Sequence, residues 1–87
     1  MTHTYSDIET RLKRASGHLN KIISMLADDC PCLDIAQQLQ AVEKAVHNAK
    51  VLLVQDYIEH CLEDAANKKG GVDRAALKEF KQITKYL

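Results

Sequence analysis

Three cysteines are the residues of this chain best suited to chemistry: Cys30, Cys32 and Cys61. Cys30 and Cys32 flank Pro31, so one residue separates them, whereas metal-binding pairs usually have two residues between the cysteines. A disulfide between cysteines this close in sequence is usually strained. We therefore interpret Cys30 as an accessory thiol. An odd number of cysteines also argues against a disulfide framework and favours thiols that are reduced, reactive or bound to metal.

Cys32 and Cys61 are the main candidates because of where their helix is expected to place them. Cys32 is predicted in the first turn, where free amides and the helix dipole favour a thiolate, whereas Asp28, Asp29 and Asp34 nearby work against it. Cys61 follows 29 residues later, about 43 Å along a straight helix, so the two cannot meet within one chain. They can meet only if two such helices run antiparallel in a dimer. The alternative for each cysteine alone is a small buried apolar residue.

Two further residues accompany Cys61. Tyr57 lies one turn earlier on the same helical face, and a tyrosine there is more typical of a core or an interface than of chemistry. His60 precedes Cys61 directly and is expected to be a surface or interface histidine. Both are accessory candidates.

A basic face is predicted on the first helix. Its members stand at offsets of 0, 3, 7 and 10, which places them on one side: Arg11, Arg14, His18 and Lys21. No acidic residue lies between Glu9 and Asp28, so this face is suited to contacts with DNA phosphates. The alternative is an ordinary solvated face. No helix-turn-helix, zinc-finger or aromatic RNA-binding pattern is present.

The elements that must position these residues are all helical. Apolar residues at alternating spacings of four and three predict a helix over about 6–27, with Ser6 and Glu9 as a capping box. Pro31 suits the start of a long helix over 31–67, and a third helix is predicted over about 73–86. The fold class is therefore all-α, short, long and short. We interpret residues 1–87 as a single helical DNA-binding sensor domain.

The long helix carries more apolar surface than its neighbours can cover. At roughly 55 Å it is longer than either of the other helices. One apolar set is predicted to face them: Ile35, Leu39, Val42, Val46, Ala49 and Leu53. A second set needs another partner: Val51, Val54, Ile58 and Leu62. Pairing between subunits is therefore expected, and an 87-residue monomer would also be marginal in stability.

Charge and hydropathy restrict the class of protein. The formal net charge is +0, but residues 1–27 carry +2, residues 28–67 carry −6 and residues 68–87 carry +4. An assembly that gathers the first helices could therefore present a positive surface. An acidic solvated face is expected near the end of the long helix: Asp56, Glu59, Glu63 and Asp64. No membrane span or signal segment is expected, which predicts a cytoplasmic protein. No set of nucleophile and base indicates an enzyme.

Taken together, these residues resemble the copper-sensing operon repressor family, which also holds nickel/cobalt, formaldehyde and persulfide sensors. Three segments carry the resemblance: RLKRASGHL at residues 11–19, CLDI at 32–35 followed by QQLQAV at 37–42, and Cys61. The resemblance covers about residues 6–66.

The resemblance implies a homotetramer built from antiparallel dimers, in which Cys32 of one subunit faces Cys61 of the other. It also implies a basic surface, including Arg14, that binds double-stranded operator DNA until an inducer arrives. Thiol modification or metal binding would then favour the state that releases DNA.

One departure from the family bears on the inducer. Copper sensors of this family place a histidine one turn before the second cysteine, where this sequence has Tyr57. Two thiolates then remain for copper(I). The persulfide-sensing branch keeps both cysteines and lacks that histidine. The main hypothesis is therefore a repressor that leaves its operator when the Cys32 and Cys61 pair reacts with reactive sulfur species or an oxidant.

Two alternatives stay open. The first is a metal-responsive repressor that binds copper(I) or another soft metal through Cys32 and Cys61, with Cys30 or His60. Copper(I) would then be the inducer, and no other cofactor is required. The second is a helical assembly or metal carrier that does not bind DNA, which predicts no salt-dependent binding to an operator.

Overall fold

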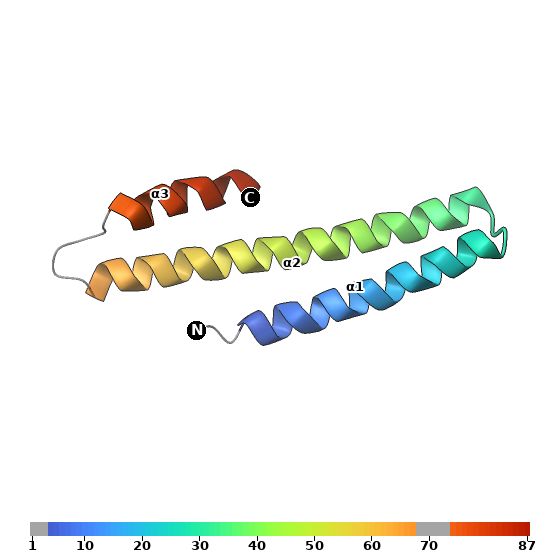
Figure 1. Cartoon of the computed structure of the whole chain (residues 1–87), viewed down its shortest axis with the longest axis horizontal. Helices are drawn as coiled ribbons and strands as arrows, with labels where there is room; N and C mark the ends of the chain where they lie inside the picture. Colours follow the sequence, from blue (N-terminus) through green and yellow to red (C-terminus); the bar gives the residue numbers. More distant parts are fainter. Residues whose placement is uncertain (1–3, 68–73) are drawn as a thin grey trace.

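A computed structural model describes residues 4–67 and 74–87 of the chain. α1 (Thr4–Ala27) and α2 (Cys32–Asn67) form an antiparallel hairpin, and all regular structure in the described residues is helical (Figure 1). The predicted all-α class, with short, long and short helices, is therefore confirmed.

The third helix lies against the outer side of the hairpin. α3 (Arg74–Ile83) continues into a single 3₁₀ turn, η1 (Thr84–Tyr86), and runs beside the C-terminal half of α2, on the side away from α1 (Figure 1). Two glycines after a helix and an aspartate before one predict that the long helix ends at Gly70 and Gly71 and that Asp73 caps the third helix, but these three residues lie outside the described residues.

The start of α1 differs from the prediction. The helix begins at Thr4, so Ser6 lies inside it and its carbonyl accepts a hydrogen bond from Thr10 Oγ1 at 3.0 Å. Glu9 instead pairs with Lys13 at 2.9 Å. The predicted capping box is wrong because the helix extends past Ser6 toward the N-terminus.

The turn between α1 and α2 is a Schellman motif. Asp29 has a φ of 54°, and its amide donates to the carbonyl of Leu26 at 3.3 Å. The amide of Cys30 donates to the carbonyl of Met25 at 3.0 Å. This pair of bonds around a left-handed residue ends a helix and reverses the chain. Aspartate is one of the few residues besides glycine that adopts this conformation readily.

Pro31 then starts the second helix. Its carbonyl accepts the first helical bond, from the amide of Ile35 at 3.1 Å, and Cys32 is the first residue of α2. The helix thus begins one residue later than predicted. Because proline fixes its own φ and lacks an amide hydrogen, it suits the residue that enters a helix.

The core is a narrow seam between α1 and α2. The buried apolar residues of α1 are spaced seven apart: Ile8, Ala15 and Ile22. Those of α2 are Val42, Ala49 and Val54. Seven residues are close to two helical turns, so Ile8, Ala15 and Ile22 form one line and Val42 and Ala49 another, whereas Val54, five residues after Ala49, lies about 140° further around α2. Ala15 and Ala49, with their small side chains, let the two backbones approach closely.

The predicted apolar stripes are only partly buried. In the first set on α2, Leu39, Val46 and Leu53 remain 46%, 43% and 37% exposed. In the second set, Val54 is buried, whereas Leu62 is 63% exposed. On α1, Leu12 and Leu19 are also exposed. A two-helix seam covers one line of side chains per helix, so the flanking apolar residues stay open to solvent.

One predicted surface residue is buried. Asp56 was expected on a solvated acidic face, yet only 9% of it is exposed, while Glu59, Glu63 and Asp64 are exposed as predicted. The difference arises because Asp56 lies seven residues after Ala49, on the side of α2 that faces the seam. A separate finding concerns membranes: none of the described helices has the length and apolar character needed to span a bilayer.

Candidate functional site

The sensor candidate at the start of α2 is accessible. Cys32 is exposed and Cys30 is half-buried in the preceding turn, and both are free thiols. As the first residue of α2, Cys32 lies beside amides that have no partner within the helix. The thiolate is the form of a cysteine that binds metal or attacks sulfur, and the exposed position of Cys32 leaves its sulfur open to either partner.

Cys61 lies near the opposite end of the same helix. It is a half-buried free thiol. The 29 residues between Cys32 and Cys61 make close to eight full turns at about 3.6 residues per turn, so both thiols lie on one side of α2. The structure therefore does not bring them together within one chain. Among the described residues, no group of three or more His, Cys, Asp or Glu side chains could hold a metal ion.

Tyr57 is held between Cys61 and α3. Partial burial raises the pKa of the Tyr57 phenol to about 12, with further contributions from a hydrogen bond to Cys61, the charge on Cys61, and the charge of Glu79. Tyr57 consequently stays a neutral phenol at physiological pH.

Glu79 was not predicted to belong to this site. It lies on α3, and nothing in the spacing of the sequence links it to Tyr57, because the intervening residues do not fix where α3 packs. The only sequence signal is weak: Glu79 is the one acidic residue on an otherwise basic helix. Its approach to Tyr57 depends on the packing of α3 along α2.

His60 is not oriented with the sensor thiols. Its Nδ1 lies 3.9 Å from a carboxylate oxygen of Glu63, and its side chain is 45% exposed. As the direct neighbour of Cys61, it projects about 100° further around the helix. His60 and Cys61 thus face different directions in a single chain.

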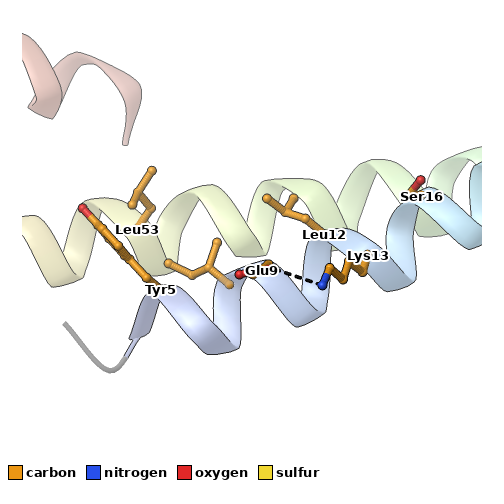
Figure 2. A pocket seen from close by; sticks show the side chains of 7 residues that line it. Tyr5, Glu9, Leu12, Lys13, Ser16 and Leu53 are labelled. Carbon is orange, nitrogen blue, oxygen red and sulfur yellow. Dashed lines mark ion pairs between the residues drawn. The ribbon is translucent and has the colours of Figure 1, made fainter. Parts of the chain in front are cut away.

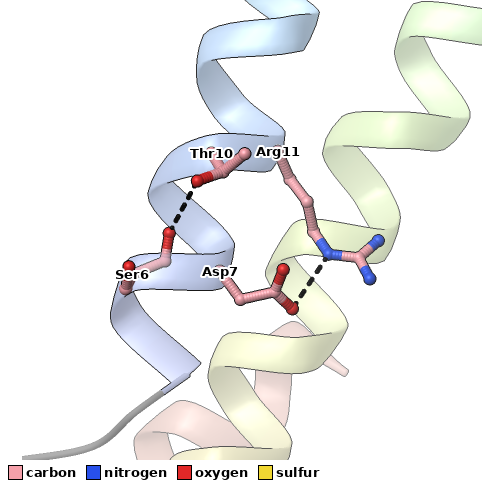
Figure 3. A network of polar contacts seen from close by, with 4 residues as sticks. All are labelled: Ser6, Asp7, Thr10 and Arg11. Atoms are coloured by element: carbon pink, nitrogen blue, oxygen red, sulfur yellow. Dashed lines mark hydrogen bonds and ion pairs between the residues drawn. The ribbon is translucent and has the colours of Figure 1, made fainter.

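The predicted basic face is present and mostly open. Arg11, Arg14 and Lys21 are exposed along α1. Figure 3 shows Arg11 extending from α1 toward α2, with its Nε donating to Asp7 Oδ2 at 3.3 Å. An exposed pair of this kind contributes about 0–1 kcal/mol, so Arg11 can exchange it for another anion at little cost.

His18 has a different environment from the other three. It is half-buried, and its Nε2 lies 2.6 Å from Oε1 of Gln38 on α2. An amide oxygen only accepts, so Nε2 carries the hydrogen. His18 therefore links the basic face of α1 to Gln38, which lies on α2 six residues after Cys32.

We expect the bond between His18 and Gln38 to stabilise the hairpin. In a double-mutant cycle of His18→Ala and Gln38→Ala, the coupling in the free energy of unfolding should be about 1 kcal/mol, as for a partly buried neutral hydrogen bond. Urea unfolding at a fixed protein concentration measures it. The matched cycle of His18→Ala with Gln37→Ala, an exposed neighbour, should show almost no coupling. Equal coupling in the two cycles would contradict the bond.

An apolar groove opens on the other side of the seam. Figure 2 shows Tyr5, Leu12 and Leu53 along it, with the Glu9 and Lys13 pair at its edge. The groove spans both helices, because Leu53 of α2 lines it together with Tyr5, Ile8 and Leu12 of α1. The basic face and this apolar surface thus lie on opposite sides of the buried line of Ile8, Ala15 and Ile22.

Comparison with known proteins relates this arrangement to a family. The copper-sensing transcriptional repressor CsoR of Bacillus subtilis is 38% identical over 82 residues, which cover 90% of this chain and 79% of that protein. CsoR of Mycobacterium ulcerans is 33% identical over 90 residues, covering 99% and 75%. The copper-sensing transcriptional repressor RicR of Mycobacterium tuberculosis is 30% identical over 60 residues, covering 69% and 62%. No solved structure matches the chain.

These relatives are transcriptional repressors, which confirms that the chain is not an enzyme. A family model described as "Metal-sensitive transcriptional repressor" matches residues 4–86, nearly the whole chain. The sequence resemblance is thereby confirmed, and the chain belongs to the family of metal-sensitive transcriptional repressors.

Proposed function

We propose that this protein is a copper(I)-responsive repressor whose sensor site forms between two antiparallel copies of α2. Cys32 of one copy and Cys61 of the other are its thiolate ligands. The main hypothesis from the sequence was a reactive-sulfur sensor, but the relatives are copper-sensing repressors, and they favour the metal-responsive alternative.

The observation that carries this proposal is the stripe between the two cysteines. Starting from Cys32, apolar residues follow at seven-residue intervals: Leu39, Val46 and Leu53. All three are exposed in the single chain, and they lie on the side of α2 that holds Cys32 and Cys61. A line of exposed apolar residues with a thiol at each end suits an interface with a second copy.

Antiparallel pairing through this stripe brings the thiols together. The midpoint between residues 32 and 61 falls beside Val46. A twofold axis there places the N-terminal end of one α2 helix beside the C-terminal end of the other. Each dimer then holds two equivalent sites. The single chain is also poorly compact: its radius of gyration is 18.2 Å, against about 12 Å for a globular chain of this length.

The ligand set of each site follows from the side chains near the thiols. Copper(I) prefers thiolate and imidazole, and Tyr57 offers only a neutral phenol. Cys30 comes from the same turn as Cys32, whereas His60 faces Glu63. We therefore favour two thiolates from Cys32 and Cys61, with Cys30 before His60 as the third ligand.

The output of the sensor is DNA binding. The basic face of Arg11, Arg14 and Lys21 is proposed to contact phosphates of the operator, and pairs of dimers would bring several such faces together as a homotetramer. Cys32 of one subunit and Cys61 of the other would hold copper(I) between them, and this would fix the ends of the two α2 helices to each other. Copper acts as an inducer when the DNA-free state holds the two thiolates at a better spacing for copper than the DNA-bound state does.

A reactive-sulfur sensor is the second candidate, and the environment of Tyr57 favours it. A pair of thiolates without a third ligand suits sulfur chemistry. The Cys32 thiolate attacks hydrogen disulfide, gains one sulfur atom as a persulfide and releases hydrosulfide. The Cys61 thiolate of the other subunit attacks the inner sulfur, forms a disulfide and expels a second hydrosulfide.

Fluorescence anisotropy of the reduced protein on its own upstream DNA tests the proposal. We expect salt-dependent binding, and release when copper(I) reaches one ion per subunit, because each dimer has two sites. A parallel titration with polysulfide distinguishes the inducers. Release by polysulfide alone would replace copper with the second candidate. Failure to bind DNA at any salt concentration would contradict the repressor function itself.

A further inference from the structure

A second basic surface lies on the last helix of the chain. Its members follow at offsets of 0, 4, 7 and 11, which places them in one narrow strip along α3 and η1, here called the α3 stripe: Arg74, Lys78, Lys81 and Lys85. All of them are exposed, and none forms an ion pair with another described residue. The described part of the chain therefore leaves these positive charges unpaired.

The α3 stripe faces solvent because of how α3 packs. Ala76, Phe80 and Ile83 are half-buried and lie together on one side of the helix, which is the side that contacts α2. At about 100° per residue, the stripe lies about 160° around the helix from them. Glu79, the one acidic residue of α3, acts on Tyr57 of α2 and lies about 130° from the stripe. The stripe thus presents positive charge alone on the outer side of the molecule.

The α3 stripe is separate from the basic face of α1. α1 and α3 lie on opposite sides of α2, and α3 lies toward the C-terminal end of α2 (Figure 1). The two surfaces therefore cannot contact the same phosphate. A polyanion that contacts both must extend past α2, as a DNA duplex longer than the segment held by α1 does.

The length and composition of the stripe suit a nucleic-acid strand. From Arg74 to Lys85 it extends about 16 Å at 1.5 Å per residue. Phosphates of one DNA strand follow about every 3.4 Å along the duplex axis, so the stripe spans about five of them. Apart from Arg74, its members are lysines, whose flexible side chains act as point charges and need no fixed geometry. Such charges hold phosphates without reading the base sequence.

We propose that the α3 stripe binds the phosphate backbone of DNA that flanks the segment contacted by the basic face of α1. The inference rests on the proposed function, since it takes DNA as the partner, but it concerns another helix and another part of the duplex. It predicts a contribution to affinity that does not depend on base sequence and that grows with the length of the duplex.

Neutral substitutions on the stripe test this contact. Lys78→Gln together with Lys81→Gln removes two charges at exposed positions, and glutamine forms helix about as well as lysine. Fluorescence anisotropy over a range of salt compares two duplexes: the shortest operator duplex that still binds, and the same duplex extended at both ends by unrelated sequence. On the extended duplex the double variant should bind at least about tenfold more weakly than the wild type, and the slope of log K against log salt should fall by about 0.9 for each lost contact. On the short duplex it should bind as the wild type does.

Two control variants separate this contact from net charge and from the side chain itself. Lys13→Gln removes a charge at the edge of the apolar groove and should leave the difference between the two duplexes unchanged. Lys78→Arg together with Lys81→Arg keeps both charges and should keep the wild-type slope.

The inference is overturned if the double glutamine variant loses no more affinity on the extended duplex than on the short one. Equal losses on both duplexes would mean that the charges act on the operator segment, and no loss on either would mean that the stripe does not contact DNA. Both outcomes leave the proposed repressor intact. A wild-type protein that binds neither duplex would refute the repressor and this contact together.

Discussion

Neither Cys32→Ser nor Cys61→Ser should bind copper(I) as a pure variant, whereas an equal mixture of the two should bind about a quarter as much copper as the wild type, because half of its dimers are mixed and each mixed dimer keeps one of two sites. Each site takes one thiolate from each subunit, so every site in a pure variant lacks a ligand. In a mixed dimer, one site keeps both thiolates and the other keeps neither. We expect the affinity of each pure variant for copper(I) to fall by more than about 100-fold. Loss of a residue that only supports a metal ligand costs up to about 100-fold, and loss of the ligand itself should cost more.

The experiment mixes the two variants, unfolds them in urea, refolds them together and counts bound copper against a chelator of known affinity. Each variant treated alone in the same way is the control. A copper site within one chain would give no recovery on mixing, and that result would contradict the antiparallel pair. Cys30→Ser tests the third ligand in the same assay: it should lower the affinity and leave the number of copper ions unchanged.

The helices of this protein could be predicted from the sequence because their signals are local. Pro31 and the seven-residue apolar spacings define where α1 and α2 run. The turn between α1 and α2 was harder to predict, because Asp29 adopts a left-handed conformation that glycine usually adopts at the end of a helix. Which apolar line is buried could not be predicted. Leu39 and Val42 belong to the same apolar pattern, so the sequence does not show which of them is buried. Val42 is buried because α1 packs against that side of α2.

For the candidate site too, the residues could be predicted from the sequence, but their surroundings could not. Cys32 and Cys61 stand out by residue type and spacing, and the basic face of α1 follows from helical periodicity. Their environments depend on packing between segments far apart in the chain. Gln38 binds His18, and Glu79 approaches Tyr57, through contacts between helices that no local pattern encodes. A family resemblance indicates the class of protein but not these contacts.

A charged residue in place of Val46 should weaken the assembly of the dimer. The proposed twofold axis passes beside Val46, so Val46→Glu sets two carboxylates against each other. At about 5 Å and an effective dielectric constant of about 20, their repulsion is about 3 kcal/mol, equal to roughly a 100-fold weaker dimer. Val46→Lys should weaken the dimer similarly. Because Val46 is 43% exposed in the single chain, both variants should keep their helix content.

Mixing the two variants separates repulsion from misfolding. Val46→Glu and Val46→Lys should form a mixed dimer, because the axis then pairs opposite charges, and sedimentation velocity over a range of concentrations would detect it. Gln55→Glu and Gln55→Lys are the matched controls: Gln55 is exposed and lies nine residues, or half a turn, around α2 from Val46. These controls should assemble as the wild type does. If Val46→Glu alone also does so, the axis lies elsewhere, and Cys32 cannot face Cys61 across it.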